Sequence, residues 1–336
     1  MKYFFTLALL FVLSITSLWA QNSILVPIDT LKISLNKNNS YARSDANNEY
    51  FVFQNLSTQN LHVYSFASKK EHIIPLKKGR GPNEYLQIGS IIIDKTNTIY
   101  LLDTNGFKLI RLNVNGNYDD DIVYEIKAHF INLKKYQNDI YASTAMDIHN
   151  GSYYHKIKLD NNSADIISLH PKYIVENPIK FKNPFNFYGR SDVNQNHIVH
   201  AHIYSSKFSI YPLDTTKNMI EINYDEYIID DETTIIGEGT VAILPPAKVL
   251  VKLENMFVHP TNSYNVYINA EGRTKNKSYF KNMIYKYDLN KEEFSDSYDL
   301  GFTPSELMRY KNKLYVIPKF EDGIKHKGIY VYEIVD

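Results

Sequence analysis

The feature that most constrains the fold is a short pattern that recurs six times along the chain. Each copy contains a polar turn with an Asn, a strand that ends in aromatic or β-branched residues, and a second, alternating strand. The first strands end at residues 51, 100, 141, 199, 267 and 315. Their mean spacing of about 53 residues is typical of propeller repeats. The pattern therefore predicts six blades, each a small antiparallel sheet packed around a common axis.

The two ends of the chain are expected to meet in the last blade. The second strands fall at residues 61–64, 108–114, 154–159, 208–213, 283–289 and 328–334, so the last copy lacks an outermost strand. Residues 24–35 supply an unclaimed strand, with Leu31, Ile33 and Leu35 alternating on one face. Pairing it with the last copy leaves no open edge in the ring. The predicted fold is all-β, a six-bladed β-propeller closed by an N-terminal strand that completes the last blade.

Two other fold classes fit the sequence less well. A helical solenoid is disfavoured because no segment keeps an apolar period of 3.6 residues for long. A two-sheet sandwich is the main alternative, but about two dozen strands are too many for one sandwich. Apolar residues make up 44% of the chain, enough for a folded core, and 28 Tyr with 17 Phe favour strands.

The N-terminus has the features of a signal peptide. Lys2 supplies a positive charge, residues 4–15 are apolar, and Ala20 precedes the expected cleavage site. Such a stretch is too short for a membrane span, which takes about 20 residues, and no later stretch is long enough. We expect residues 1–20 to be removed, residues 21–336 to form one domain, and the protein to be exported to the periplasm or beyond. An uncleaved anchor is the alternative, because Leu18 is large for its place before the cleavage site.

Composition excludes several classes of function. Lys and Arg number 37, as do Asp and Glu, so no basic surplus supports nucleic-acid binding. The chain has no Cys, which excludes disulfides, thiolate metal sites, cysteine nucleophiles and a lipidated N-terminal Cys. No nucleophile elbow, H-E-x-x-H or P-loop motif occurs. No cofactor is predicted.

One segment resembles a known family. It runs from residue 77 to residue 116 and holds Gly79, Gly81, Pro82, Glu84 and Tyr85 as a G-x-G-P-x-E-aromatic element, followed by strands around residues 91–94 and 99–103. This segment resembles the secreted six-bladed β-propeller family of Gram-negative gut-type anaerobes and, more distantly, the NHL-repeat propellers. The resemblance implies a periplasmic or surface propeller, frequently a lipoprotein and usually without an assigned reaction. The missing lipoprotein Cys is a departure from that family.

The same element has two interpretations. Gly79 and Gly81 are expected to take positive φ at a blade-to-blade crossing, with Pro82 stiffening the exit. Glu84 could accept backbone N–H groups or pair with Arg80. The element is then a structural latch between blades. In the alternative, Arg80, Glu84 and Tyr85 bind a ligand in a central funnel.

Two further stretches supply candidate ligand-binding residues. His200 and His202 share one face of a strand, but no third ligand lies nearby in sequence, so packed or hydrogen-bonded histidines are favoured and no metal site is predicted. Arg190 lies in a long connection, residues 170–192, whose aromatic residues could stack on a sugar or peptide or plug a blade edge. Those aromatic residues are Phe181, Phe185, Phe187 and Tyr188. An insertion at residues 225–262 predicts either a loop over the funnel or an extra hairpin.

We interpret the chain as an exported propeller that acts as a ligand-binding or protein-interaction module. The expected ligand is a small molecule, a glycan or a peptide, and a protein partner is also compatible with the pattern. The alternative is an enzyme on the same scaffold, a metal-dependent hydrolase or lyase of the lactonase kind. It would need inward-facing His or carboxylate ligands from at least three blades. The step from fold to function here is analogy.

Overall fold

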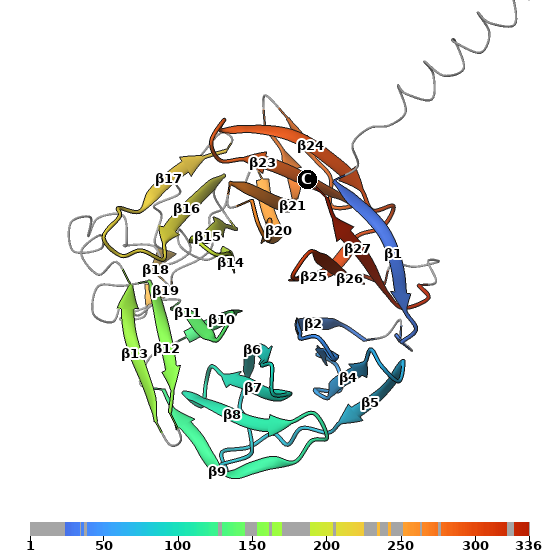
Figure 1. The fold of residues 1–336 in the computed structure, drawn as a ribbon, viewed down its shortest axis with the longest axis vertical. Coiled ribbons are helices and arrows are strands. Elements are labelled where there is room, and N and C mark those ends of the chain that lie inside the picture. The colour runs from blue at the N-terminus through green and yellow to red at the C-terminus, as the bar shows by residue number, and fades with distance from the viewer. Residues whose placement is uncertain are drawn as a thin grey trace, which may run out of the picture.

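The structure is a six-bladed β-propeller, which confirms the predicted fold class. The computed structural model describes residues 24–33, 35–36, 39–126, 130–144, 153–160, 163–169, 189–203, 206–224, 234–235, 241–242, 251–262, 264–274, 277–320 and 326–335. These residues contain strands and no helix, and hence no helix that could cross a membrane. Six antiparallel sheets stand around a common axis (Figure 1).

The blades follow one another along the chain, and each begins with its innermost strand. Blade 1 comprises β2 (Tyr41–Ala46), β3 (Tyr50–Asn55), β4 (Leu61–Ser65) and β5 (Lys70–Ile74). Blade 2 comprises β6 (Ile88–Ile93), β7 (Thr98–Asp103), β8 (Lys108–Asn113) and β9 (Tyr118–Glu125). Blade 3 comprises β10 (Phe130–Tyr136), β11 (Asp139–Thr144), β12 (Tyr154–Leu159) and β13 (Ala164–Leu169).

The second half of the ring repeats this order with one extra strand. Blade 4 comprises β14 (Gly189–Val193), β15 (His197–His202), β16 (Lys207–Pro212) and β17 (Ile220–Asn223). Blade 5 comprises β20 (Val251–Val258), β21 (Asn265–Arg273), β23 (Met283–Asp288) and β24 (Glu293–Asp299), with the short β22 (Ser278–Tyr279) paired to β21. Blade 6 comprises β25 (Pro304–Tyr310), β26 (Lys313–Pro318), β27 (Ile329–Ile334) and the N-terminal strand β1 (Leu25–Leu31).

The N-terminal strand closes the ring, as predicted. β1 runs antiparallel to β27, from the pair Leu25 and Ile334 to the pair Leu31 and Ile329. Figure 1 shows the blue start of the described chain beside its red end. Because β1 supplies the outermost strand of blade 6, the described start and end of the propeller are held in one sheet.

The recurrent pattern in the sequence marks the second and third strands of each blade, not the first. The innermost strand precedes each polar turn, its unpaired edge faces the centre of the ring, and in several blades it is less apolar than the strands that follow. In β14, for example, Arg190, Ser191 and Asp192 follow one another. A polar strand of this kind carries no alternating apolar pattern to reveal it.

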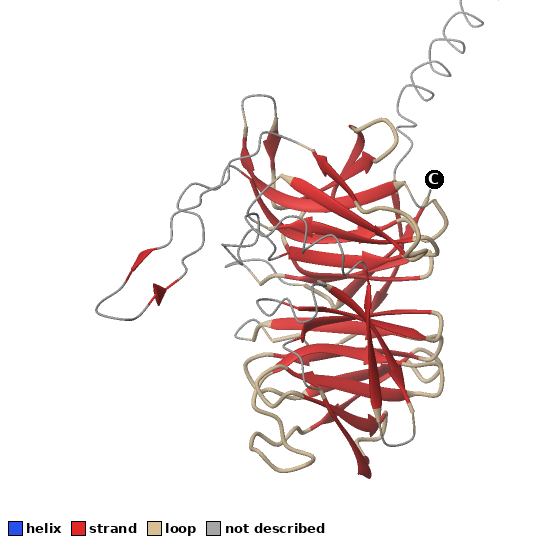
Figure 2. Ribbon diagram, turned by 90° about the vertical axis from the view of Figure 1, so that its left-hand side faces the viewer, coloured by secondary structure: helices blue, strands red, loops and turns tan. Residues whose placement is uncertain are grey.

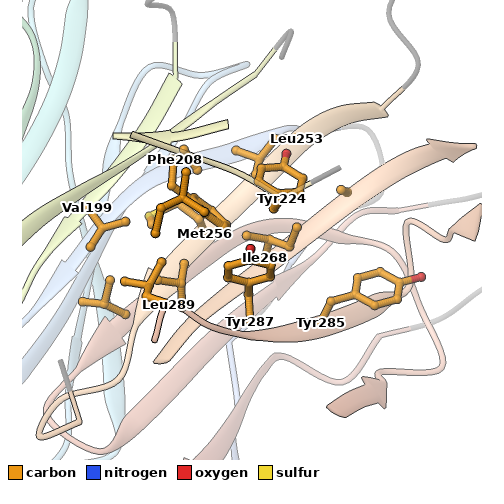
Figure 3. Packing of buried hydrophobic residues seen from close by; sticks show 14 of the residues in the cluster. Val199, Phe208, Tyr224, Leu253, Met256, Ile268, Tyr285, Tyr287 and Leu289 are labelled. Carbon is orange, nitrogen blue, oxygen red and sulfur yellow. The ribbon is translucent and has the colours of Figure 1, made fainter. Parts of the chain in front are cut away.

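The core consists of apolar layers between neighbouring blades. The second strands are buried on both faces, as the pattern of β7 shows, because each sheet packs against the blade before it and the blade after it. Phe51 of blade 1 stacks on Tyr315 of blade 6 with ring centroids 5.0 Å apart. Figure 3 shows the layer between blades 4 and 5, where Phe208 contacts Tyr287 with centroids 5.2 Å apart. Buried apolar area of this kind supplies most of the favourable free energy of folding.

The insertion at residues 225–262 contains two separate structures. Its last part includes β20, the innermost strand of blade 5. Before β20 lie two short strands, β18 (Thr234–Ile235) and β19 (Val241–Ala242), which pair only with each other. Figure 2 shows this two-stranded sheet to one side of the ring. Of the two predicted forms of the insertion, the extra hairpin agrees with these strands.

Candidate functional site

The centre of the ring holds a cavity of about 700 Å³. Residues of all six innermost strands line it, and it extends to turn residues that include the exposed Gln87 and Asn105. We call this end of the cavity the channel mouth. It lies where the innermost strands begin.

Five innermost strands place a polar residue at the same level of the channel. Each of these residues lies opposite the same position of its neighbouring strand, because the strands of every blade pair in nearly the same register. We call this set the polar ring. It consists of Ser90, Asn132, Arg190, Asn255 and Glu306, opposite Leu102, Ser143, Ala201, Asn269 and Ile317.

Blade 1 contributes an arginine next to this ring. Arg43 forms a one-residue bulge in β2, with a φ of 53°. Its Nε donates to the carbonyl oxygen of Gly89 at 3.1 Å, and its Nη1 donates to Oε1 of Gln54 at 3.2 Å. Bulges re-aim a side chain at the edge of a sheet. Here the bulge directs the side chain of Arg43 toward the neighbouring blade.

Some side-chain groups of the polar ring have no hydrogen-bond partner among the described protein residues. Arg190 is exposed, and its Nε donates to the carbonyl oxygen of Glu254 at 3.2 Å. Asn255 is only 5% exposed, yet no described protein group hydrogen-bonds to its side-chain amide. Because Asn255 lines the central cavity, its amide is available to hydrogen-bond a ligand there.

The opposite end of the channel is tied by an ion pair across blade 5. Arg309 of blade 6 donates from Nε to Oδ2 of Asp192 of blade 4 at 2.8 Å and from Nη2 to the carbonyl oxygen of Val193 at 2.7 Å. The backbone N–H of Val258 donates to the same Asp192 oxygen at 3.1 Å. Burial raises the pKa of Asp192, but the Arg309 and Lys134 cations outweigh it, so the pKa lies below its usual value.

A second ion pair occupies the equivalent positions three blades away. Asp45 of blade 1 accepts from the backbone N–H of Ile93 at 2.8 Å, and Lys135 of blade 3 lies 3.5 Å from Asp45. Lys135 also donates to the carbonyl oxygen of Ile93. Asp45 and Lys135 line both the central cavity and a second cavity of about 570 Å³. The pair therefore lies at the boundary between the two cavities.

The G-x-G-P element lies outside the channel lining. Glu84 accepts the backbone N–H of Gly81 at 2.9 Å and pairs with Lys77, not with Arg80. Its hydrogen bond to Lys77 is the main reason why the pKa of Glu84 is lowered. Tyr85 is buried in the layer between blades 1 and 2. Arg80 is exposed and lines a separate pocket of about 690 Å³. These contacts agree with the latch interpretation. Arg80, Glu84 and Tyr85 do not line the central cavity, in contrast to the funnel interpretation.

The predicted reason for the two glycines is wrong. Neither Gly79 nor Gly81 has a positive φ. A Cβ on Gly79 would instead lie 2.0 Å from Oε2 of Glu84, and one on Gly81 would lie 3.1 Å from the same atom. The glycines leave room for the Glu84 carboxylate, so space and not backbone conformation explains them.

The two strand histidines are packed and hydrogen-bonded. His200 and His202 are each 1% exposed. Nδ1 of His200 lies 2.7 Å from the hydroxyl of Tyr154, and Nε2 of His202 lies 2.8 Å from the hydroxyl of Ser209. A Cβ at position 189 would come within 2.3 Å of Nε2 of His200, which explains the glycine there. Over the described residues, no group of three or more His, Asp or Glu is arranged to hold a metal ion.

Of the six candidates from the sequence, only Arg190 lines the channel. The aromatic residues predicted to accompany it, at positions 181, 185, 187 and 188, lie outside the described residues. Sequence reasoning missed Asn255 and Glu306, as well as both ion pairs. The available signal was position. Each polar-ring residue precedes the recurrent Asn turn by the same number of paired residues along its strand.

Fold and channel together define the class of the protein, a six-bladed β-propeller with a polar central channel. The model of the DUF5128 family, described as a 6-bladed beta-propeller, matches residues 38–234, and the chain belongs to this family. A search of the curated proteins gives no match.

The solved structures that resemble the whole ring include the following two. One is a member of the duf4221 family from Bacteroides vulgatus, with 12% identity, a TM-score of 0.56, and coverage of 93% of this chain and 95% of that chain. The other is a streptogramin B lyase, with 10% identity, a TM-score of 0.50, and coverage of 93% and 97%. At such identities the likeness concerns the fold alone.

Proposed function

We propose that this propeller is an exported ligand-binding module whose site is the channel mouth with the polar ring below it. The observation that carries the proposal is the buried Asn255 amide, which has no partner among the described protein groups. This amide lines the central cavity, so a bound ligand can supply hydrogen bonds that no described protein group makes. The ion pairs at the far end favour entry from the mouth.

The size of the cavity favours a small polar ligand over a folded protein partner. Sites for small molecules have volumes of about 300–1,000 Å³, and the channel cavity has about 700 Å³. Arginine and amide groups from different blades converge on it, and such groups fix the orientation of a ligand.

Export rests on the leader at residues 1–20. The apolar stretch at residues 4–15 and Ala20 before the cleavage site support a signal peptide. The test is fractionation of the producing cell combined with the mass of the mature chain. Recovery outside the cytoplasm with residue 21 as the first residue is expected. A cytoplasmic protein that retains residues 1–20 would contradict export.

The binding function is tested by thermal unfolding with amino acids, short peptides, sugar acids and neutral sugars. We expect at least one class to raise the unfolding midpoint of the wild type, because a ligand that binds only the folded state stabilises it. Arg190→Gln and Asn255→Leu should remove that shift. Arg273→Gln is the matched control, because Arg273 is exposed at the end of β21 and should keep the shift. A ligand whose shift survives both channel variants would contradict a site in the channel.

A further inference from the structure

Three successive innermost strands present three different polar groups at one level. Arg190 on β14, Asn255 on β20 and Glu306 on β25 each lie opposite the equivalent residue of the next strand in their blade. Neighbouring innermost strands are in contact around the ring. From blade 4 to blade 6, the channel wall therefore presents a guanidinium, an amide and a carboxylate in succession.

The three groups are free to meet a ligand. The guanidinium of Arg190 donates only from Nε, to the carbonyl oxygen of Glu254, so both of its terminal nitrogens are without a described protein partner. Within the part of the chain that the structure describes, the carboxylate of Glu306 has no ion-pair or hydrogen-bond partner. Asn255 lies between them, 95% buried and also without a partner for its amide. All three residues line the central cavity.

The order of these groups selects a chemical class. A guanidinium fork binds a carboxylate through two parallel hydrogen bonds, and a carboxylate binds an ammonium group. An amide donates and accepts at once, and therefore matches a peptide bond. We propose, building on the proposed binding function, that the channel takes a short peptide with free ends. Its carboxyl terminus lies on Arg190, its peptide bond on Asn255 and its amino terminus on Glu306.

The carboxylate in the wall is what separates this ligand from a simple anion. Beside Glu306, a sugar acid or phosphate would place its oxygens near a like charge, which disfavours binding. A ligand with an ammonium group at that point gains an opposite charge instead. One strand, β20, lies between the strands of Arg190 and Glu306. The two charged groups of the ligand must therefore lie apart, as the two ends of a dipeptide do.

The test is isothermal titration calorimetry of the full mature chain with glycylglycine and alanylalanine. Each dipeptide is compared with its N-acetylated and its C-amidated form, and glucuronate serves as the simple anion. The variants are Arg190→Gln and Glu306→Gln, with Arg273→Gln and Glu293→Gln as controls on exposed residues of blade 5. Circular dichroism confirms that each variant is folded.

We expect the free dipeptide to bind the wild type and both controls, and each blocked form to bind about tenfold more weakly or worse, since a hydrogen bond to a charged group is lost. Glu306→Gln should weaken the free dipeptide by a similar factor and leave the N-acetylated form unchanged. Arg190→Gln should likewise weaken binding of the free dipeptide and leave binding of the C-amidated form unchanged. Each variant should thus abolish the effect of blocking one particular end of the dipeptide. If Arg190 and Glu306 had only structural roles, the two variants would not differ in this way.

Two results overturn the proposal in distinguishable ways. Glucuronate binding that depends on Arg190, with no dipeptide binding, rejects the peptide and leaves the channel as a binding site. Dipeptide binding that is unchanged in both Arg190→Gln and Glu306→Gln rejects both the peptide placement and the channel site.

Discussion

Arg309 of blade 6 and Asp192 of blade 4 form an ion pair across the intervening blade, with 2.8 Å between Nε and Oδ2. Their side chains are only 10% and 8% exposed. Asp45 and Lys135 repeat this arrangement between blades 1 and 3. Each pair joins two blades that are not neighbours, so the pairs tie the ring from within, in addition to the apolar layers between adjacent blades.

Removal of one partner of the buried pair should be costly. Arg309→Leu leaves Asp192 as a buried charge without its main partner, and we expect a loss of about 3–5 kcal/mol in the free energy of unfolding. Lys217→Leu is the control, because the pair of Lys217 and Asp214 is exposed and should contribute less than about 1 kcal/mol. Urea unfolding measures both. Equal losses in the two variants would show that the Asp192 pair is not a structural tie.

The same variant should change how stability depends on pH. Because the pKa of Asp192 is below its usual value of 3.8, its contribution is present above that pH and is lost as the pH falls through the folded pKa. In Arg309→Leu the main cation beside Asp192 is lost, so we expect its pKa to rise. The carboxyl should then protonate at a higher pH, and the loss of stability relative to the wild type should become smaller in acid. Urea unfolding should give a smaller difference in the free energy of unfolding between variant and wild type near pH 4 than near neutral pH. A difference that is the same at both pH values would contradict this prediction.

The latch between blades 1 and 2 predicts coupling between two positions. Gly79→Ala forces the Glu84 carboxylate out of its place, because a Cβ would lie 2.0 Å from its Oε2. We expect the thermal midpoint to fall by about 2 °C or more. In a Glu84→Ala background, the same glycine substitution should cost much less, because the clashing group is gone. A full cost in both backgrounds would mean that Glu84 is not the reason for the glycine.

Fluorescence tests the leader. Trp19 is the only Trp of the chain and lies within residues 1–20. A chain cut after Ala20 should therefore show tyrosine emission alone. Indole emission from the purified mature protein would show that the leader is retained, as in the anchor alternative.

Metal analysis separates the binding module from the enzyme alternative. We expect no stoichiometric zinc or calcium in the purified mature chain, because His200 and His202 already have Tyr154 and Ser209 as partners. The measurement is elemental analysis after dialysis. One zinc or calcium ion per chain would favour the metal-dependent hydrolase or lyase.

The ring could be predicted because its middle strands are visible in sequence. Ile99, Leu101 and Leu102 are buried on the two faces of β7, so most of the strand is apolar, and it directly follows the recurrent Asn turn. The closing strand was predictable for a similar reason, since Leu31 and Ile33 alternate in a segment without another partner. Repetition made both signals stronger than any single strand would be.

The site could not be predicted in the same way. Its residues lie on innermost strands, where polar side chains interrupt the apolar pattern. Arg190 and Glu306 are more than a hundred positions apart, and it is the shared register of the blades around the ring that places them at one level. The motif with the clearest signal, around Glu84, proved to be a latch, because local sequence patterns report local structure first.

Closure of the ring by β1 is the claim on which the channel depends, and a disulfide tests it most directly. Val26 pairs with Glu333 in β27, and directly paired residues have Cα atoms about 4.5–5.5 Å apart, within the range of a disulfide. Tyr330 pairs with Thr30 and lies three residues further along the strand, at about 10 Å. The chain has no Cys of its own, so a count of free thiols reports on the introduced pair alone.

The account predicts that Val26→Cys with Glu333→Cys loses both free thiols on mild oxidation and stays monomeric. Its thermal midpoint should rise, because the bond constrains the unfolded chain. Val26→Cys with Tyr330→Cys should keep both thiols free. Equal bonding in the two double variants, or none in the first, would contradict a ring closed in this register.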